Sequence, residues 1–363
     1  MVDPNQLIRP HIRSMAPYQP ILPFEVLSEA LGREPNEIVK LDANENPYGP
    51  PQVVQQALAE LEFIHIYPDP ESRRLRRALS QAYSVPMENL LAGAGADELI
   101  DLLMRLLLDP GDAMLSFPPT FSMYSFDGAL NRAKVIEIPR RPDFKLDLPA
   151  IERAVSDAKP KLAFIANPNN PDGSLITDNE IEALLSLPLI LALDEAYIEF
   201  ADKGSSWLAQ VPSRKNLVVL RTFSKWAGLA GLRLGFGAFP RSLMGHLWKI
   251  KQPYNVSVAA SQAGLAALAH RDSLEALGQK IRDERARLHQ LLTDIDYLQP
   301  YPSQANFILC RVVDRSTSAL KARLAEDGIL IRYFDKPGLH DHIRISVGRP
   351  QETDRLIEFL KGW

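Results

Sequence analysis

The sequence predicts an α/β fold with a mainly parallel central sheet flanked by helices, followed by a smaller α+β domain. Short, mainly aliphatic runs recur in the middle of the chain, as the strands of a parallel sheet buried on both faces require. These runs alternate with segments of helical periodicity, which is the order of elements in a parallel α/β sheet. The clearest runs cover residues 161–166, 187–193 and 217–221.

The segments before these strands fit the same architecture. The first 45 residues are rich in proline and irregular, apart from a short helix at 24–31 that Gly32 ends. Pro50 and Pro51 precede a helical period, and proline is favoured in the first turn of a helix. Further along we expect a basic helix at 72–83, a strand at 89–92 and a buried helix at 97–108 that Pro110 and Gly111 stop.

The pattern changes after about residue 260. A long helical pattern at 258–292 precedes a strand–helix–strand–strand–helix succession, which indicates the smaller α+β domain. The strands are expected at 306–312, 329–332 and 343–347, and the helices at 318–327 and from 351 onward. We therefore expect an N-terminal arm that includes part of the small domain (1–45), a large domain (46–255) and a small C-terminal domain (256–363).

Length and charge exclude several classes of protein. A chain of 363 residues suggests about two domains. Its 41 Lys and Arg against 45 Asp and Glu give a net charge of −4, unlike the basic surface of a nucleic-acid binder. The apolar runs fall short of the ~18 residues of a membrane span, and the first 20 residues lack the apolar core of a signal peptide. We expect a cytoplasmic protein that contacts neither membrane nor nucleic acid.

Metal and disulfide chemistry are not indicated. A single cysteine excludes an intrachain disulfide framework and a cysteine-based zinc site, and Cys310 lies in an apolar run, as an inert core thiol would. His340 and His342 lack the nearby partners of a metal site, so we expect solvated loop histidines. A basic cluster is read as a solvated helix face or the rim of an anionic site: Arg73, Arg74, Arg76 and Arg77.

Four polar motifs each follow directly after a predicted strand. The carboxyl ends of parallel strands meet at one edge of the sheet, and ligands bind in the crevice outside that edge. Motifs spread over more than 120 residues of chain would therefore converge on one site. They are Gly93–Glu98 (GAGADE), residues 167–173 (NPNNPDG), residues 194–197 (DEAY) and residues 222–225 (TFSK).

Each motif alone has a simple structural explanation. The first is a tight strand-to-helix turn whose N–H groups favour a phosphate; it is neither a P-loop nor a full dinucleotide fingerprint, because Glu98 occupies the third glycine position. The second has the composition of a surface turn. Asp194 requires a cation or several hydrogen bonds if it is buried, and is otherwise a loop acid. Lys225 is either a surface lysine or a desolvated nucleophile.

Together the motifs match the requirements of pyridoxal phosphate. This cofactor needs a lysine for its aldehyde, an anion for its pyridinium nitrogen and a cradle for its phosphate. Lys225 supplies the first and Asp194 the second, while the Gly93–Glu98 turn, Ser224 and Arg233 supply the third. Asn170 or Tyr197 is placed to hydrogen-bond the ring hydroxyl.

The motifs also resemble those of the fold-type I aminotransferases, which use pyridoxal phosphate. The resemblance rests on Asn170-Pro171-x-Gly173, Asp194-x-Ala196-Tyr197, Thr222-x-Ser224-Lys225 and Gly231-Leu232-Arg233-x-Gly235. Within that group, LDANENP at 41–47, Tyr67-Pro68-Asp69, Gly95-Ala96-Asp97-Glu98 and DEAYIEF at 194–200 are similar to the histidinol-phosphate aminotransferases. The resemblance runs from about Pro10 to the C-terminus.

The resemblance implies a role for each cofactor residue. Lys225 forms a Schiff base with the cofactor and then moves the proton between Cα and C4′. Asp194 pairs with the pyridine nitrogen, while Tyr197 and Asn170 hydrogen-bond the ring oxygen. Phe121 stacks on the ring, where the family often has tyrosine. The phosphate is held by Ala96, Asp97, Ser224 and Arg233, and by Tyr67 of the neighbouring subunit, which implies a homodimer with shared active sites.

The resemblance also implies the substrates. Arg344 matches the arginine that grips the anionic end of the substrate, with Arg332, Tyr18 and Asn44 beside it. Histidinol phosphate carries a phosphate and glutamate two carboxylates, and a guanidinium binds both groups. The reaction implied is transfer of the amino group of L-histidinol phosphate to 2-oxoglutarate, giving imidazole-acetol phosphate and glutamate, a step of histidine biosynthesis. Asp172 stands where the family has threonine, and aspartate serves equally well in a turn.

Three alternatives carry different functions. An aminotransferase for aromatic amino acids would use the same arginines, and a threonine-phosphate decarboxylase of the same fold would share the lysine, the aspartate and a phosphate pocket. DEAYIEF and Asn44-Glu45-Asn46-Pro47 favour the histidinol-phosphate reaction. A transcription regulator built on this fold would need an added DNA-binding domain of roughly 50 residues or more, for which the chain has no room.

Overall fold

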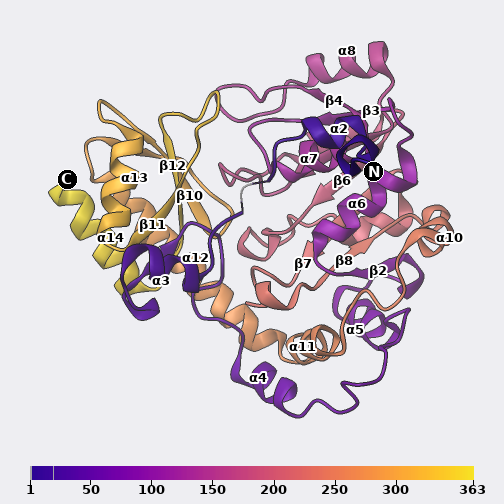
Figure 1. Ribbon diagram of the computed structural model, residues 1–363, viewed down its shortest axis with the longest axis horizontal. Helices are drawn as coiled ribbons and strands as arrows, with labels where there is room; N and C mark the ends of the chain where they lie inside the picture. The colour runs from indigo at the N-terminus through magenta and orange to yellow at the C-terminus, as the bar shows by residue number, and fades with distance from the viewer. Residues whose placement is uncertain (1, 19) are drawn as a thin grey trace.

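The computed structural model describes residues 2–18 and 20–363, so Met1 and Gln19 of the predicted arm lie outside it. Its larger sheet has seven strands in the order β2-β8-β7-β6-β5-β3-β4 (Figure 1). Neighbours pair in parallel except β8, which runs antiparallel to both β2 and β7. The strands are β2 (Leu90–Gly93), β3 (Ala113–Ser116), β4 (Lys134–Glu137), β5 (Leu162–Ala166), β6 (Ile190–Asp194), β7 (Leu217–Thr222) and β8 (Gly235–Ala238). Six strands therefore point their carboxyl ends at one edge.

Helices cover both faces of this sheet. Alternate residues of a strand face opposite sides, so Leu191 and Leu193 of β6 enter one core, whereas Ala192 enters the other. The first core includes α5 (Arg73–Tyr83), α8 (Leu148–Ala158), α9 (Asp178–Leu185) and α11 (Val258–Ala269). The second includes α6 (Ala96–Leu107), α7 (Met123–Leu130) and α10 (Arg241–Ile250). Burial on both faces is why these strands are mainly aliphatic in sequence.

The smaller sheet has five strands in the order β1-β11-β12-β10-β9. Its first strand comes from the N-terminal region, where β1 pairs in parallel with β11. The strands are β1 (Val39–Leu41), β9 (Leu298–Pro300), β10 (Phe307–Val312), β11 (Ile329–Tyr333) and β12 (His342–Ser346), with helices α12 (Arg271–Thr293), α13 (Thr317–Glu326) and α14 (Pro350–Gly362) beside them. The N-terminal region thus contributes a strand to the C-terminal sheet.

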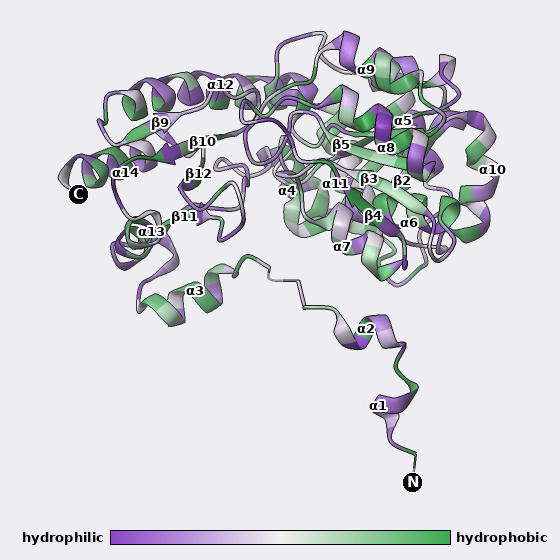
Figure 2. Cartoon of the chain, turned by 90° about the horizontal axis from the view of Figure 1, so that it is seen from above, coloured by the Kyte–Doolittle hydropathy of each residue, from purple (hydrophilic) through white to green (hydrophobic). Residues whose placement is uncertain are grey.

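The N-terminal region is more helical than its prolines predict. It contains α1 (Pro4–Leu7), α2 (Pro10–Ser14) and α3 (Phe24–Leu31), and α4 (Gln52–Ala59) follows β1. Two of the prolines occupy first-turn positions, where the missing N–H has no helical acceptor to reach. The predicted end of α3 is confirmed, since Gly32 adopts the left-handed conformation at φ 62°. Figure 2 shows α1 away from the two sheets, whereas α2 lies near α7.

The long helical pattern at 258–292 is two helices rather than one. His270, with φ −121°, separates α11 from α12. Gly264 of α11 lies against Leu75 and Leu234, where an added Cβ would meet Leu234 at 2.5 Å, so α11 packs with the larger sheet. The predicted domain boundary near residue 255 stays a prediction, and the packing of α11 favours a boundary close to His270.

Two predictions about polar side chains are wrong. His342 is buried rather than solvated, because β12 begins one residue earlier than expected and places the ring against Tyr301 and Phe144. Arg76 is also buried. Its guanidinium donates to the carbonyl oxygens of Leu90 (2.9 Å) and Met87 (2.8 Å) around the start of β2.

Three further observations concern the single cysteine, membrane-spanning helices and metal-binding clusters. Cys310 is fully buried in β10, which confirms the prediction of a core thiol. No helix within the described residues is long and apolar enough to cross a bilayer. Across residues 2–18 and 20–363, no three His, Cys, Asp or Glu side chains gather as a metal ion would require.

Candidate active site

The four predicted motifs meet at the carboxyl edge of the larger sheet, joined there by β12 of the smaller sheet. The Nδ2 of Asn170 lies 3.5 Å from the hydroxyl of Tyr197, and the Nζ of Lys225 lies 6.0 Å from the centre of the Tyr197 ring. Arg344 of β12 donates to Oδ1 of Asn170 at 2.6 Å. Residues separated by up to 302 positions therefore share one site, since Arg344 also donates to the carbonyl oxygen of Asp42.

Lys225 follows β7 directly and is partly buried. Its amine donates to the carbonyl oxygen of Ala43 at 3.1 Å. Desolvation, and then the positive charge of Arg344, lower the pKa of Lys225 to about 8. Compared with an ordinary lysine, that pKa increases the neutral, nucleophilic amine at pH 7 roughly 300-fold. The structure therefore excludes the surface-lysine alternative.

Asp194 ends β6 and is 5% exposed. Its Oδ2 accepts from the hydroxyl of Tyr124 at 2.7 Å and its Oδ1 from the N–H of Ala196 at 3.1 Å. Burial raises the pKa of Asp194 to about 6, against the lowering effect of the Tyr124 hydrogen bond. No ion pair joins Asp194 to a lysine or arginine anywhere in the described chain. The site therefore holds a buried carboxylate that lacks a cation.

Tyr124 was not singled out from the sequence. It is fully buried on α7 and stacks on Phe164 with ring centres 5.1 Å apart, while its hydroxyl reaches Asp194. A buried tyrosine hydroxyl normally finds a polar partner, so a tyrosine in a buried helix beside the sheet edge was the available signal. Only the tertiary structure identifies that partner.

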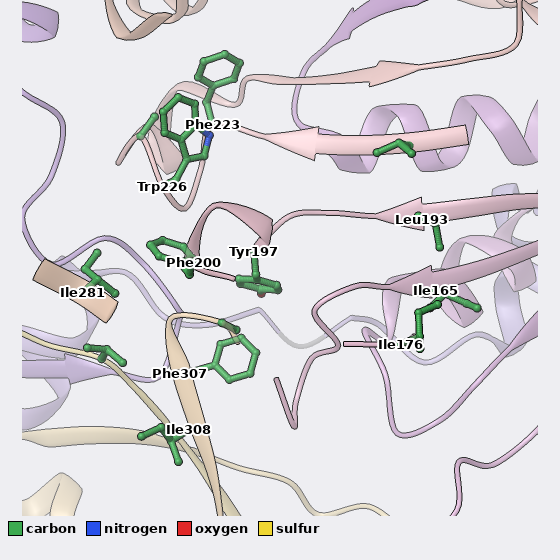
Figure 3. Close-up of a cluster of buried hydrophobic side chains, with 14 of the residues drawn as sticks. Ile165, Ile176, Leu193, Tyr197, Phe200, Phe223, Trp226, Ile281, Phe307 and Ile308 are labelled. Carbon is green, nitrogen blue, oxygen red and sulfur yellow. The ribbon is translucent and has the colours of Figure 1, made fainter. Parts of the chain in front are cut away.

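Tyr197 receives two amide donors. The Nδ2 of Asn44 lies 3.1 Å from its hydroxyl oxygen, and the Nδ2 of Asn170 lies 3.5 Å from the same oxygen. Asn44, at φ 55°, is held by Ser346, whose hydroxyl donates to Oδ1 of Asn44 at 3.0 Å. Figure 3 shows the Tyr197 ring next to Phe307, and the two rings meet edge to face at 5.0 Å. Asn44, predicted as a substrate residue, thus makes its contacts here with protein groups.

The Gly93–Glu98 turn forms one wall of the site. Gly95 adopts φ 85°, and an added Cβ would lie 2.7 Å from Nη2 of Arg233. That guanidinium donates to Asp97 at 2.8 Å and lies 3.4 Å from the hydroxyl of Ser224. Ala96 and Asp97 begin α6, where backbone N–H groups have no acceptor within the helix. The turn, Ser224 and Arg233 therefore surround one potential anion position.

Arg344 is buried and only partly satisfied. Its Nη2 donates to the carbonyl oxygen of Asp42 at 2.7 Å, whereas its buried Nε has no partner. Burial lowers the pKa of Arg344 to about 10, with the nearby Tyr197 opposing this shift. Arg332 sits opposite it across β11 and β12, and both guanidiniums lie over Phe334, at 5.8 and 5.7 Å. Two arginines therefore flank one face of the site.

The remaining predicted residues lie at the margins of this cluster. Phe121 meets Tyr124 edge to face at 5.5 Å, which places it on the Asp194 side. Tyr18 meets Phe126 of α7 at 5.9 Å. Tyr67 is 79% exposed and stacks on Tyr254 with ring centres 4.7 Å apart.

The second motif is not a surface turn. Asn169 and Asp172 are buried, and Asp172 accepts from the Nδ2 of Asn169 and from the N–H of Ser174. Asn169 in turn accepts from the hydroxyl of Thr120 at 2.8 Å, which ties this turn to the loop carrying Phe121. Glu195 faces elsewhere than its neighbour Asp194, since it pairs with Arg221 at 2.9 Å. This ion pair was missed from the sequence.

Comparisons with known proteins agree with this geometry. The sequence matches the family of class I and II aminotransferases over residues 36–360. It is 53% identical, over 99% of this chain and 87% of the other, to the chloroplastic histidinol-phosphate aminotransferase of Nicotiana tabacum. The histidinol-phosphate aminotransferase of Roseiflexus castenholzii is 50% identical over 98% and 97% of the two chains. The chain belongs to the histidinol-phosphate aminotransferases.

Solved structures of this family have the same fold. The histidinol-phosphate aminotransferase of Sinorhizobium meliloti, in complex with pyridoxal 5′-phosphate, superposes with a TM-score of 0.89 at 29% identity, covering 98% of this chain and 96% of that one. The prediction of a fold-type I aminotransferase is confirmed, and with it the mainly parallel sheet flanked by helices.

Proposed function

We propose that this enzyme transfers the amino group of L-histidinol phosphate to 2-oxoglutarate with pyridoxal 5′-phosphate as cofactor, a step of histidine biosynthesis. The observation that carries the proposal is that Lys225, whose pKa is lowered to about 8, and the buried carboxyl group of Asp194 both lie at one edge of the sheet. Family membership supports histidinol phosphate as the substrate, since relatives at 50–53% identity are named histidinol-phosphate aminotransferases.

The residues present fit this cofactor. Asp194 is a buried anion without a cation, and a protonated pyridine nitrogen is the cation that would compensate it. The first N–H groups of α6, the hydroxyl of Ser224 and the guanidinium of Arg233 fit a phosphate. Asn170 and Tyr197 are placed to hydrogen-bond the ring oxygen, and Phe121 to stack on the ring.

When bound, the cofactor supplies an aldehyde for the substrate amine and a ring that accepts the electrons released when Cα loses its proton. The chain supplies the proton chemistry. With the cofactor bound, Lys225, partly neutral near pH 7, would take the proton from Cα of the substrate and return it at C4′ of the cofactor. Asp194 would hold a proton on the ring nitrogen, because its carboxylate is buried and oriented by Tyr124. Tyr197 is held in place by Asn44 and Asn170.

The arginines fit both substrates. Histidinol phosphate presents a phosphate and 2-oxoglutarate a second carboxylate at the end remote from the reaction. The Nε of Arg344 is buried without a partner, so a donor is available for an anionic oxygen. Arg332 adds a second positive charge opposite it. We propose that Tyr18, and Asn44 through its contact with Tyr197, complete this substrate end.

We also propose a homodimer with shared active sites. Tyr67 is exposed beside three large apolar side chains, Phe63, Ile64 and Ile66, which are 55–74% exposed. Such a strip is typical of a protein interface, and a second copy of this chain would bring Tyr67 to the partner's phosphate. Light scattering on the purified protein tests the assembly. The cytoplasmic location stays a prediction, which cell fractionation tests.

The decisive experiment follows one turnover. Cofactor-loaded enzyme is mixed with L-histidinol phosphate without any oxo acid, and imidazole-acetol phosphate is measured by mass spectrometry. We expect one equivalent per active site, and continued turnover with glutamate formation once 2-oxoglutarate is added. Reaction with phenylalanine or tyrosine in its place would support an aromatic aminotransferase, and release of carbon dioxide from threonine phosphate would support the decarboxylase.

A further inference from the structure

Glu98 occupies a position in the phosphate turn that the proposed chemistry does not use. It is the third residue of α6, counted from Ala96. At that position a glutamate usually reaches back to the backbone N–H of the residue that caps the helix. Here the cap is Gly95, and its N–H already donates to the carbonyl oxygen of Gly93 at 2.9 Å. Glu98 therefore reaches one residue further, and its Oε2 accepts from the N–H of Ala94 at 2.6 Å.

The same oxygen of Glu98 is held from a second side. The Nδ2 of Asn255 lies 2.7 Å from Oε2 of Glu98 and 3.3 Å from the carbonyl oxygen of Ala92, at the end of β2. The Oδ1 of Asn255 accepts from the Nζ of Lys251 at 2.8 Å. Lys251 is 9% exposed, so a buried cation stands behind the amide. Asn255 thus connects the charges of Lys251 and Glu98 and ties both to the turn.

This arrangement has a consequence for the phosphate position. A carboxylate in the first turn of a helix is attracted to the free N–H groups there. Glycine at the cap provides no side chain to occupy those groups, so an unrestrained Glu98 would compete with a phosphate for the N–H groups of Ala96 and Asp97. The bonds to Ala94 and Asn255 hold the Glu98 carboxylate to the strand side of the turn and leave the N–H groups free.

We infer that Glu98 and Asn255 are positioning residues for the cofactor phosphate: Asn255 restrains the Glu98 carboxylate, and the restrained carboxylate orders the turn that presents the N–H groups of α6. The inference rests on the proposed use of pyridoxal 5′-phosphate. Neither residue touches the reacting atoms. Their effect is on retention of the phosphate and not on recognition of the pyridine ring, which Asp194 and Lys225 hold.

The test compares two ligands that differ only in the phosphate. Apoprotein is titrated with pyridoxal 5′-phosphate and with pyridoxal, and binding is followed by quenching of tryptophan fluorescence. For Asn255→Ala we expect the Kd for pyridoxal 5′-phosphate to rise at least about tenfold, because Glu98 is released towards the phosphate. The Kd for pyridoxal should change by less than about threefold. Circular dichroism checks that each variant is folded.

Two further variants separate restraint from general stability. Glu98→Gln removes the competing charge and keeps an acceptor for Ala94, so Asn255→Ala made in that background should have a smaller effect than in the wild type. Glu352→Ala is the matched control, because Glu352 holds the same third position in α14, accepts from a backbone N–H at 2.6 Å and lies in the small domain. It should leave the ratio of the two Kd values unchanged.

The outcomes distinguish this inference from the proposed function. Equal weakening of both ligands by Asn255→Ala, or no change in either, would overturn the positioning role while leaving the cofactor assignment intact. An equal effect of Asn255→Ala in the Glu98→Gln background would overturn the restraint of Glu98. A wild-type protein that binds neither ligand would overturn the cofactor assignment itself, and the inference with it.

Discussion

Replacing Tyr124 by phenylalanine removes the one side-chain hydrogen bond that Asp194 accepts within residues 2–18 and 20–363. The hydroxyl lies 2.7 Å from Oδ2 and lowers the pKa of Asp194 against the larger effect of burial, which raises it to about 6. A hydrogen bond to a charged group contributes about 1.5–3 kcal/mol. At 1.36 kcal/mol per pH unit, its loss should raise the pKa of Asp194 further, by about 1 to 2.

The effect should depend on pH in a defined way. Below pH 5 Asp194 is protonated in both proteins, and well above pH 8 it is ionised in both. Near pH 7 it is about 90% ionised in the wild type but only about 10–50% ionised in Tyr124→Phe, so the variant should bind pyridoxal 5′-phosphate about two- to tenfold more weakly there. Titrating both apoproteins by fluorescence between pH 5 and 9 and taking the ratio of the Kd values cancels the titrations of the cofactor itself.

The free energy of unfolding should also depend on pH through the protonation of Asp194. The folded-state pKa of Asp194 lies above its ordinary value of 3.8, so the stability linked to its protonation is present at low pH and is lost as the pH rises through about 6. The difference in free energy of unfolding between the two proteins should therefore widen between pH 5 and 8. Tyr297→Phe is the control, because the Tyr297 hydroxyl donates to the neutral carbonyl oxygen of Leu360. A ratio of Kd values that is flat with pH in Tyr124→Phe would refute the reasoning.

Four other substitutions or treatments test the site. Lys225→Ala should lower product formation by at least ~10³-fold, and full activity would exclude its role in proton transfer. Arg344→Gln should raise KM for both substrates by about 10- to 100-fold. Because Arg344 lowers the pKa of Lys225, the same variant should move the pH midpoint of cofactor uptake above about 8. Tyr67→Phe should weaken cofactor retention about two- to tenfold, and an unchanged Kd would argue against a contact across subunits. Cys310, whose burial raises the pKa of the thiol, should resist a thiol reagent until the protein unfolds.

Prediction from sequence succeeded where local chemistry decides the structure. The strands β5, β6 and β7 were found because burial on both faces favours mainly aliphatic residues, and the end of α3 because Gly32 adopts a left-handed conformation at little steric cost. By contrast, β8 begins Gly235-Phe236-Gly237, which looks like a loop. Its glycines are needed because an added Cβ at Gly235 would lie 2.6 Å from the N of Ala96. That requirement exists only when β8 packs beside the phosphate turn.

In the candidate site, too, the sequence indicates some residues and only the structure identifies others. The positions of Lys225, Asp194 and Asn170 after strands indicated a shared sheet edge, because parallel strands align their carboxyl ends. The side chains that tune them were not visible in the same pattern. Tyr124 acts on Asp194 across 70 residues of chain and Asn255 on Glu98 across 157, and neither spacing carries a sequence signal.

The sequence by itself determined the parallel architecture and indicated the cofactor chemistry, because periodicity and residue type at strand ends are local properties, and the resemblance of its motifs indicated the family. The tertiary structure decided which groups are buried, which hydrogen bonds they make and so which protonation states they favour. It showed a carboxylate at Asp194 without a cation, an arginine Nε at Arg344 without an acceptor and a glutamate at Glu98 tied away from the phosphate turn. Burial and pairing depend on residues that only the folded chain brings together, and for that reason the sequence predicts the kind of site but not how its charges are balanced.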